Sequence, residues 1–399
     1  MPKLTTYAAS AEDVKTAIEA GAKHLILEDA KVSIRCYSDD YKELHFEKVT
    51  YLANLAREIS PSIELSFNID VMAHDYHLPT ITDAVNTCRY AGISEFRVQD
   101  PGLALLIKTL HPEATLTLAT ETGNNNSGSH RVFSRWFARQ MLGNELTHTE
   151  IAAMTQGNAS TFDIQVHGPI LIQYSYRRYM SGFRTSRGET SRRLAQDLEY
   201  PGRYFPFFEN PHGHFMYLFF DRCLIKYIPL LTSLNIGRWI VDARGESLAY
   251  LKTALQAYKN ALHEFEQSPT QYELSPKTIS DLESVGKRAL KAGFFLANKT
   301  DSERRLALKI LQDTSQYLGT IVDVIRGKWI TIELERSISV PSPVTLFSPE
   351  GPQVSFNIDS LFTLTDEPLA HSSHNRYVKT AWQKGAVPKS VLLAQETLD

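Results

Sequence analysis

Short apolar runs alternate with longer amphipathic segments along the first part of the chain. The runs, which are typical of buried strands, lie at 4–8, 24–27, 63–69, 95–98 and 114–118. Apolar residues recur at helical spacing between them, at 12–20, 46–59, 81–91 and 103–110. Strands that alternate with such helices indicate parallel β-α-β units. The repeats predict an α/β fold with a (β/α) barrel-like N-terminal domain, and an open doubly wound sheet is the second interpretation.

The pattern changes towards the end of the chain. Short alternating segments at 318–325, 329–334, 344–347, 354–358 and 377–380 are typical of antiparallel strands. They predict a small C-terminal antiparallel β-barrel domain. We therefore expect a barrel-like domain at 1–265 with an inserted basic and aromatic segment at 177–215, a linker and helical connection at 266–315, and the small β-barrel at 316–399.

Composition narrows the possible classes of function. The net charge of -3 gives no overall attraction to nucleic acid, so any RNA contact must be a local patch. No apolar run is long enough to span a bilayer, and the first residues lack the pattern of a signal peptide. The three cysteines, Cys36, Cys88 and Cys223, are far apart, which fits free thiols in a reducing compartment. We expect a cytoplasmic protein that does not bind a membrane.

The segment at 163–196 carries the clearest chemical signal. A β-rich run leads into His167 and Gly168, where the sequence suggests a turn, and Tyr174 follows. Arginines then stand at 177, 178, 184, 187, 192 and 193. Guanidinium groups bind carboxylates and phosphates through two parallel hydrogen bonds, so this cluster is a candidate anion site. A solvated basic surface is the alternative.

Polar residues also follow several predicted strands, whose C-terminal ends meet at the functional face of a (β/α) barrel. These residues are Asp100, Glu121, Asn124, Glu145, Asp242 and Arg244. A carboxylate and an arginine at one strand end could form an ion-pair site at the barrel mouth. Turn chemistry and structural salt bridges are the alternatives. His212 and His214 lie in an aromatic segment, but two histidines without a third ligand are weak evidence for a metal.

The segment at 163–194 resembles the signature of the bacterial collagenase-like peptidases, peptidase family U32. That signature reads roughly E-x-F-V-H-G-x-x-C-x-x-Y-S-x-x-C, followed by R-G-x-C-x-x-x-C. The residues that fall on the pattern are Asp163, Val166, His167, Gly168, Tyr174, Ser175, Arg187 and Gly188. Further similarities lie at 8–10, 33–35, 98–102, 145–147, 221–235, 239–247, 287–295 and 348–351.

The resemblance implies a function in RNA modification, because several family members are RNA or quinone hydroxylation proteins that carry an iron–sulfur cluster. It implies a prephenate-dependent hydroxylase-like enzyme that acts on the wobble uridine of tRNA. The implied catalytic candidates are His167, Glu145, Asp242 and Arg244. The candidates for binding tRNA, or a dicarboxylate such as prephenate, are Asp100, Glu121, Asn124, Tyr174, Arg177, Arg178 and Arg187.

This chain departs from the family pattern at the cluster cysteines. Leu171, Arg178, Thr190 and Leu194 occupy those positions, and none of these side chains ligates iron. We therefore expect a degenerate iron–sulfur site with no cofactor and no metal. The chain would be a divergent cluster-free enzyme or a non-catalytic subunit that partners a cysteine-bearing paralogue. The expected protein partner is that paralogue or, in a homo-oligomer, a second copy of the chain. A peptidase is the alternative function, although no nucleophile elbow or zinc-binding His-Glu-x-x-His is present. A non-catalytic RNA- or protein-binding scaffold is the third.

Overall fold

A computed structural model describes residues 2–37, 46–120, 123, 125–158, 161–180, 191–196, 203–297, 301–349, 353–373 and 376–395. The chain divides into two compact units, Met1–Asn298 and Lys299–Asp399. The break between them falls inside the segment for which the sequence predicts a linker and a helical connection.

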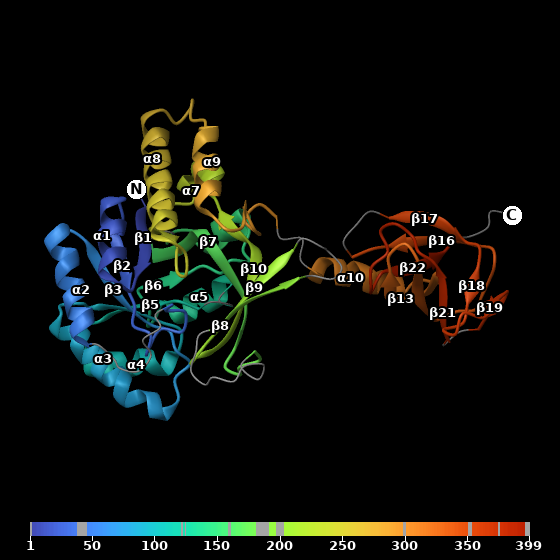
Figure 1. Ribbon diagram of the computed structural model, residues 1–399, viewed down its shortest axis with the longest axis horizontal. Coiled ribbons are helices and arrows are strands. Elements are labelled where there is room, and N and C mark those ends of the chain that lie inside the picture. The colour runs from blue at the N-terminus through green and yellow to red at the C-terminus, as the bar shows by residue number, and fades with distance from the viewer. Residues whose placement is uncertain are drawn as a thin grey trace. The chain divides into compact units, whose positions relative to one another are not determined.

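The first unit contains a closed barrel of parallel strands (Figure 1). Each strand pairs with the next in the order β11-β1-β2-β3-β4-β5-β6-β7, and β7 pairs with β11 to close the ring. The strands are β1 (Lys3–Ala8), β2 (His24–Leu27), β3 (Glu64–Ile69), β4 (Glu95–Val98), β5 (Thr115–Leu118), β6 (Arg139–Met141), β7 (Phe162–Ser175) and β11 (Arg238–Val241). The predicted (β/α) barrel is confirmed, and the open sheet is wrong because the two edges of the sheet pair with each other.

Helices cover the outside of the barrel (Figure 1). They are α1 (Ala11–Glu19), α2 (Phe46–Ile59), α3 (Leu78–Tyr90), α4 (Pro101–Leu110), α5 (Ser127–Phe133), α6 (His148–Met154), α7 (Ile228–Ser233), α8 (Leu248–Gln267) and α9 (Pro276–Val285). Their amphipathic spacing explains their position. In α8, Leu251, Leu255, Tyr258 and Leu262 recur at helical spacing and are all buried against the barrel. Ser247 caps this helix by accepting the Tyr250 N–H at 3.2 Å.

Strand β7 is longer than the sequence suggested. The turn predicted at His167 and Gly168 is wrong, because the strand continues through both residues and only its register with β11 shifts, as in a β-bulge. Gly168 has a φ of +111°, and a Cβ there would lie 1.9 Å from the carbonyl oxygen of Asp242. Because glycine has no Cβ, the backbone of β7 can approach the residue after β11 this closely.

Beyond the barrel, β7 forms an antiparallel extension with three further strands. Its neighbours are, in order, β10 (Gly213–Cys223), β9 (Tyr204–Asn210) and β8 (Ser191–Gln196), and β12 (Ala289–Lys291) pairs with β10. The similarity to the family at 221–235 implies a helix, and this is wrong for residues 221–223, which end β10. Helix η4 (Ile225–Tyr227) and α7 follow. Cys223 accordingly ends a strand and is not helical.

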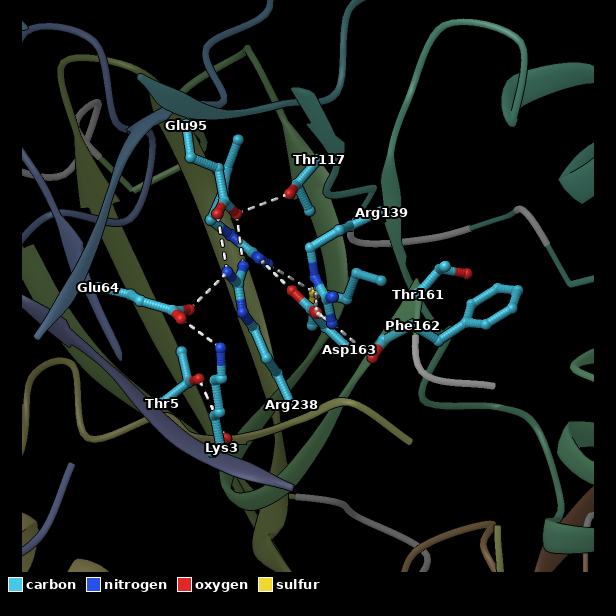
Figure 2. Close-up of polar contacts among 12 residues, drawn as sticks. Lys3, Thr5, Glu64, Glu95, Thr117, Arg139, Thr161, Phe162, Asp163 and Arg238 are labelled. Carbon is cyan, nitrogen blue, oxygen red and sulfur yellow. Dashed lines mark hydrogen bonds and ion pairs between the residues drawn. The ribbon is translucent and has the colours of Figure 1, made fainter. Parts of the chain in front are cut away.

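A network of ion pairs fills the barrel at the N-terminal ends of the strands (Figure 2). Arg238 Nη2 lies 2.8 Å from Glu95 Oε2 and 3.3 Å from Glu64 Oε2. Arg139 Nη2 lies 2.7 Å from Asp163 Oδ1. Burial would raise the pKa of Asp163, but the neighbouring arginines outweigh it and lower that pKa. Charged residues at this end of a barrel stabilise the fold, so functional groups are expected at the opposite end.

The second unit is an antiparallel sheet with its own core. Its main sheet has the order β17-β16-β22-β13-β14-β21-β18-β19, and β15 pairs with β20. The elements are α10 (Asp301–Gln312), β13 (Tyr317–Ile325), β14 (Trp329–Leu334), β15 (Ile338–Ser339), β16 (Ser342–Phe347), β17 (Val354–Ile358), β18 (Leu361–Phe362), β19 (Pro368–Leu369), β20 (His371–Ser372), β21 (Arg376–Ala381) and β22 (Val391–Ala394). Alternation along β14 buries Ile330, Ile332 and Leu334 on one face, as the sequence predicts.

Candidate functional site at the barrel mouth

The C-terminal ends of β1, β2, β3 and β11 bring a group of polar side chains together inside the barrel mouth. Glu28 directly follows β2 and Asp242 directly follows β11, and both are almost fully buried. Asn68 of β3 points into the barrel. Side chains alternate along a strand, and the preceding residue, Phe67, is buried on the outer side. The parallel order of the strands carries all of these residues to one face.

Asp242 and Arg244 form the centre of this group. Arg244 Nη2 lies 2.7 Å from Asp242 Oδ2, and its Nε lies 3.0 Å from Oδ1, so the pair is bidentate. Arg35 Nη2 lies 3.1 Å from Asp242 Oδ2. Burial favours the neutral acid, but the two arginines outweigh it and hold the pKa of Asp242 at about 2. Asp242 is therefore a fixed negative charge at neutral pH.

Glu28 differs from Asp242 although it belongs to the same group. Its Oε1 accepts from Arg244 Nη1 at 3.1 Å and from Asn68 Nδ2 at 3.0 Å. Burial raises the pKa of Glu28 to about 7, against the opposing effect of Arg244. A carboxyl group that titrates near neutral pH can both donate and accept a proton during a reaction. Adjacent carboxyl groups with pKa values pushed apart are typical of acid–base sites.

A cavity of about 380 Å³ opens beside these residues. Its lining includes Glu28, Arg244, Ser10 and Lys48, together with the residues that begin α8. The Tyr7 ring forms a wall on which the Arg244 guanidinium lies, 3.5 Å from the ring centroid. A cavity of this size accommodates a small-molecule ligand.

The loop between β2 and α2 places Arg35 over the mouth. Asp70 accepts the Ile34 N–H at 2.7 Å, and Ser33 Oγ donates to the Asn68 carbonyl at 2.9 Å. From the antiparallel extension, Asn210 Nδ2 donates to the Ile34 carbonyl at 2.8 Å. Parts of the chain far apart in sequence therefore hold Ser33 and Ile34 in place beside Arg35.

The structure brings together some of the residues singled out in the sequence. Asp242 and Arg244 lie side by side at the mouth, with Arg35 from the loop next to them. Glu28 was missed. The signal that could have found it is its position, because an acidic residue directly after a buried strand points to the C-terminal face of a barrel.

The side chains of His167 and Glu145 are not part of this group, although the His167 carbonyl accepts the Asp242 N–H at 2.9 Å. The His167 ring packs on the outer side of the barrel wall, 5.3 Å from the Tyr250 ring and 5.8 Å from the Tyr258 ring of α8. Burial lowers the pKa of His167 to about 3, so the imidazole is neutral. Glu145 is half-buried after β6, where its charge opposes the lowering of the Arg222 pKa by burial.

The remaining candidate residues are not part of the group at the barrel mouth. Asp100 caps α4 by accepting the Gly102 N–H at 2.7 Å, and Tyr174 donates to the His212 carbonyl at 2.9 Å. Arg177 and Arg178 are exposed beyond the end of β7. Glu121, Asn124 and Arg187 lie outside the described residues.

The side chains present do not fit an iron–sulfur cluster. At the family's cysteine positions, Leu171 is buried, Leu194 is exposed and neither offers a thiolate. The three cysteines are buried separately. His214 Nδ1 lies 3.1 Å from Glu209 Oε1, but the described residues contain no group of three ligands that could hold a metal ion.

The fold and the barrel mouth together define a (β/α)-barrel protein with a buried, ion-paired carboxyl group that lines a cavity at the C-terminal ends of its strands. The chain belongs to peptidase family U32, whose sequence pattern matches residues 9–305. The resemblance to this family that the sequence suggested is thereby confirmed. None of the helices in the described part of the chain combines the length and apolarity needed to cross a bilayer.

Two curated relatives match nearly the whole chain. The tRNA hydroxylation protein P1 of Bacillus subtilis (strain 168) is 18% identical over 98% of this chain and 94% of its own length. The tRNA hydroxylation protein P of Escherichia coli (strain K12) is 18% identical over 96% and 93%. Among solved structures, phosphoribosyl anthranilate isomerase from Thermotoga maritima matches 66% of this chain and 99% of its own at 10% identity, with a TM-score of 0.37.

Proposed function

We propose that this protein takes part in tRNA modification as a hydroxylase of a pyrimidine base, with the wobble uridine as its target. The observation that carries the proposal is the buried Glu28 carboxyl, which lines a ligand-sized cavity and has a pKa raised to about 7. Arg244 joins it to Asp242, a second buried carboxyl whose pKa is lowered to about 2. The two relatives named for tRNA hydroxylation match this chain almost from end to end, which supports the same class of reaction.

The chemistry of the base explains why such a carboxyl would be needed. Replacing the C5 hydrogen of uridine by a hydroxyl group is a two-electron oxidation that also releases the C5 proton. The two electrons would pass to a redox partner, such as the iron–sulfur cluster of a cysteine-bearing paralogue, and a base at the site must take up the proton. Glu28 can accept this proton at its Oε atoms when ionised, and the Arg244 and Asn68 donors at 3.1 and 3.0 Å hold it in place. A prephenate-like dicarboxylate is the proposed source of the hydroxyl oxygen, and Lys48 and Arg244 are the cations that line its cavity.

The exposed Arg177 and Arg178 are proposed contacts for tRNA phosphates, because arginines on a surface bind phosphate through charge-assisted hydrogen bonds. A second copy or a cysteine-bearing paralogue remains the proposed partner. The peptidase alternative has less support. Burial raises the pKa of the Cys88 and Cys223 thiols, which keeps them protonated and unreactive, and Cys36 is also buried.

The test is to incubate the purified protein with tRNA from cells that lack the modification, with and without prephenate, and to measure 5-hydroxyuridine by mass spectrometry. Glu28→Gln keeps the shape and the Asn68 contact but cannot take up a proton, so product formation should fall at least a hundredfold. Glu266→Gln, an exposed change at the end of α8, is the control. If the unaltered protein, alone and with a cysteine-bearing family member, yields no product but cleaves a peptide library, the proposal is wrong.

A further inference from the structure

A second cleft, of about 860 Å³, adjoins the cavity at Glu28. The two share Tyr37, Arg244, Gly245 and Glu246 as lining residues. One wall of the cleft is the antiparallel extension, and the other consists of the residues after β11 and those that enter β12. A ligand in this cleft therefore lies next to the proposed reaction site.

The wall formed by the extension is a shelf of flat apolar side chains. Tyr204, Pro206 and Phe208 alternate along β9 and so share one face, and Leu194 of β8 is paired with Pro206. Tyr204 is 48% exposed, and its ring stacks on no other ring in the described residues. Deeper in the cleft, the hydroxyl groups of Tyr37 and Tyr217 are 2.9 Å apart. An exposed tyrosine on a strand that is paired on both sides is a suitable surface for stacking a nucleobase.

The cleft is also basic. Arg193, Lys287 and Arg288 line it together with Arg244, and Glu246 is the carboxylate among the described lining residues. Lys287 is largely exposed and lies 3.1 Å from Glu246, so its ammonium group can exchange this weak contact for a phosphate. The Lys291 ammonium lies over the nearby Phe219 ring at 4.8 Å from its centroid and adds further positive charge. Exposed aromatic rings between cations are typical of sites for single-stranded nucleic acid.

We propose that this cleft binds one unpaired nucleotide of the RNA substrate, with the base stacked on Tyr204 and its phosphate between Arg193 and Lys287. A base bound in this way lies next to the cavity at Glu28, which adjoins the cleft. The assignment rests on the proposed function, because it takes the substrate to be RNA. Enzymes that act on a base take it out of its stack, so an aromatic shelf beside the reaction site compensates for the stacking that is lost.

The experiment uses the full-length protein and a short RNA hairpin that carries one 4-thiouridine in its loop. Ultraviolet cross-linking followed by peptide mapping identifies the residues next to that base. Fluorescence anisotropy measures the affinity of the same hairpin for Tyr204→Ala and Tyr204→Trp. Tyr90→Ala is the matched control, because Tyr90 is 91% exposed at the end of α3 and lines neither cavity.

We expect cross-links within 203–220 and an affinity at least fivefold lower for Tyr204→Ala, since a base–aromatic stack contributes about 1–3 kcal/mol. Tyr204→Trp, which retains a ring, should bind as the unaltered protein does. Lys287→Ala should make the RNA affinity less dependent on salt concentration. The slope of log affinity against log salt should fall by the amount expected for about one phosphate contact. Tight binding with cross-links elsewhere, and no effect of Tyr204→Ala, would overturn the cleft assignment but not the proposed function. If no RNA binds at all, both proposals fall.

Discussion

Replacing Glu28 by Gln should make the stability of the protein less sensitive to pH between about 4.5 and 7. Burial raises the pKa of Glu28 from 4.5 to about 7, so in this range the folded state keeps a proton that the unfolded state has lost. The folded state then binds more protons than the unfolded state, and the free energy of unfolding falls as pH rises. The glutamine variant has no such proton.

The magnitude follows from the size of the shift. Each pKa unit corresponds to 1.36 kcal/mol, so a shift from 4.5 to about 7 changes the difference in stability between Glu28→Gln and the unaltered protein by about 3 kcal/mol. The variant should gain this amount, relative to the unaltered protein, as pH rises from 4.5 to above 7. Other titrating groups are common to both proteins and cancel in the difference.

Urea unfolding of both proteins at half-unit pH steps from 3 to 8 measures this difference. Glu266→Gln, which changes an exposed glutamate, should give a constant difference over the same range. A flat profile for Glu28→Gln would show that burial does not perturb this carboxyl. A change confined to pH values below 4 would show that Arg244 dominates and that the pKa is lowered. Either result would remove the physical basis for Glu28 as an acid–base group.

The other predictions concern the parts of the fold that build the mouth. Asp242→Asn should lower the free energy of unfolding by about 3–5 kcal/mol, because it leaves two buried arginines without their shared carboxylate. Thermal unfolding would detect this loss, and an unchanged melting temperature would contradict it. Gly168→Ala should prevent correct folding or lower the free energy of unfolding far more than Gly157→Ala does. Both glycines have a positive φ, but of the two only Gly168 would bring the new Cβ against a backbone oxygen, at 1.9 Å. Circular dichroism and urea unfolding of the two alanine variants compare them directly, and equal losses would count against the close approach. A chain that ends at residue 298 should remain folded with a cooperative transition, since Met1–Asn298 forms a compact unit; aggregation of this fragment would place the boundary elsewhere.

Local patterns were sufficient to predict much of the architecture. Alternating strand and helix periods identified the barrel strands up to β5, because burial on both faces produces apolar runs that are visible in the sequence. The same patterns failed at β7. Glycine after histidine is ambiguous between a turn and a bulge, and the carbonyl of Asp242, which directly follows β11, decides between them.

For the site, sequence position alone identified Asp242 and Arg244 as a pair at a strand end. It could not identify Glu28 as the group that titrates near neutral pH, because that property depends on contacts across the whole barrel. Arg244, which lies 216 residues further along the chain, and Asn68 both meet the Glu28 carboxyl, and burial excludes the water that would otherwise stabilise its charge. Residue types and their spacing determined the fold class and the strand ends. The tertiary structure decided which carboxyl keeps its proton, because desolvation and distant charges set a pKa and neither is a local property of the sequence.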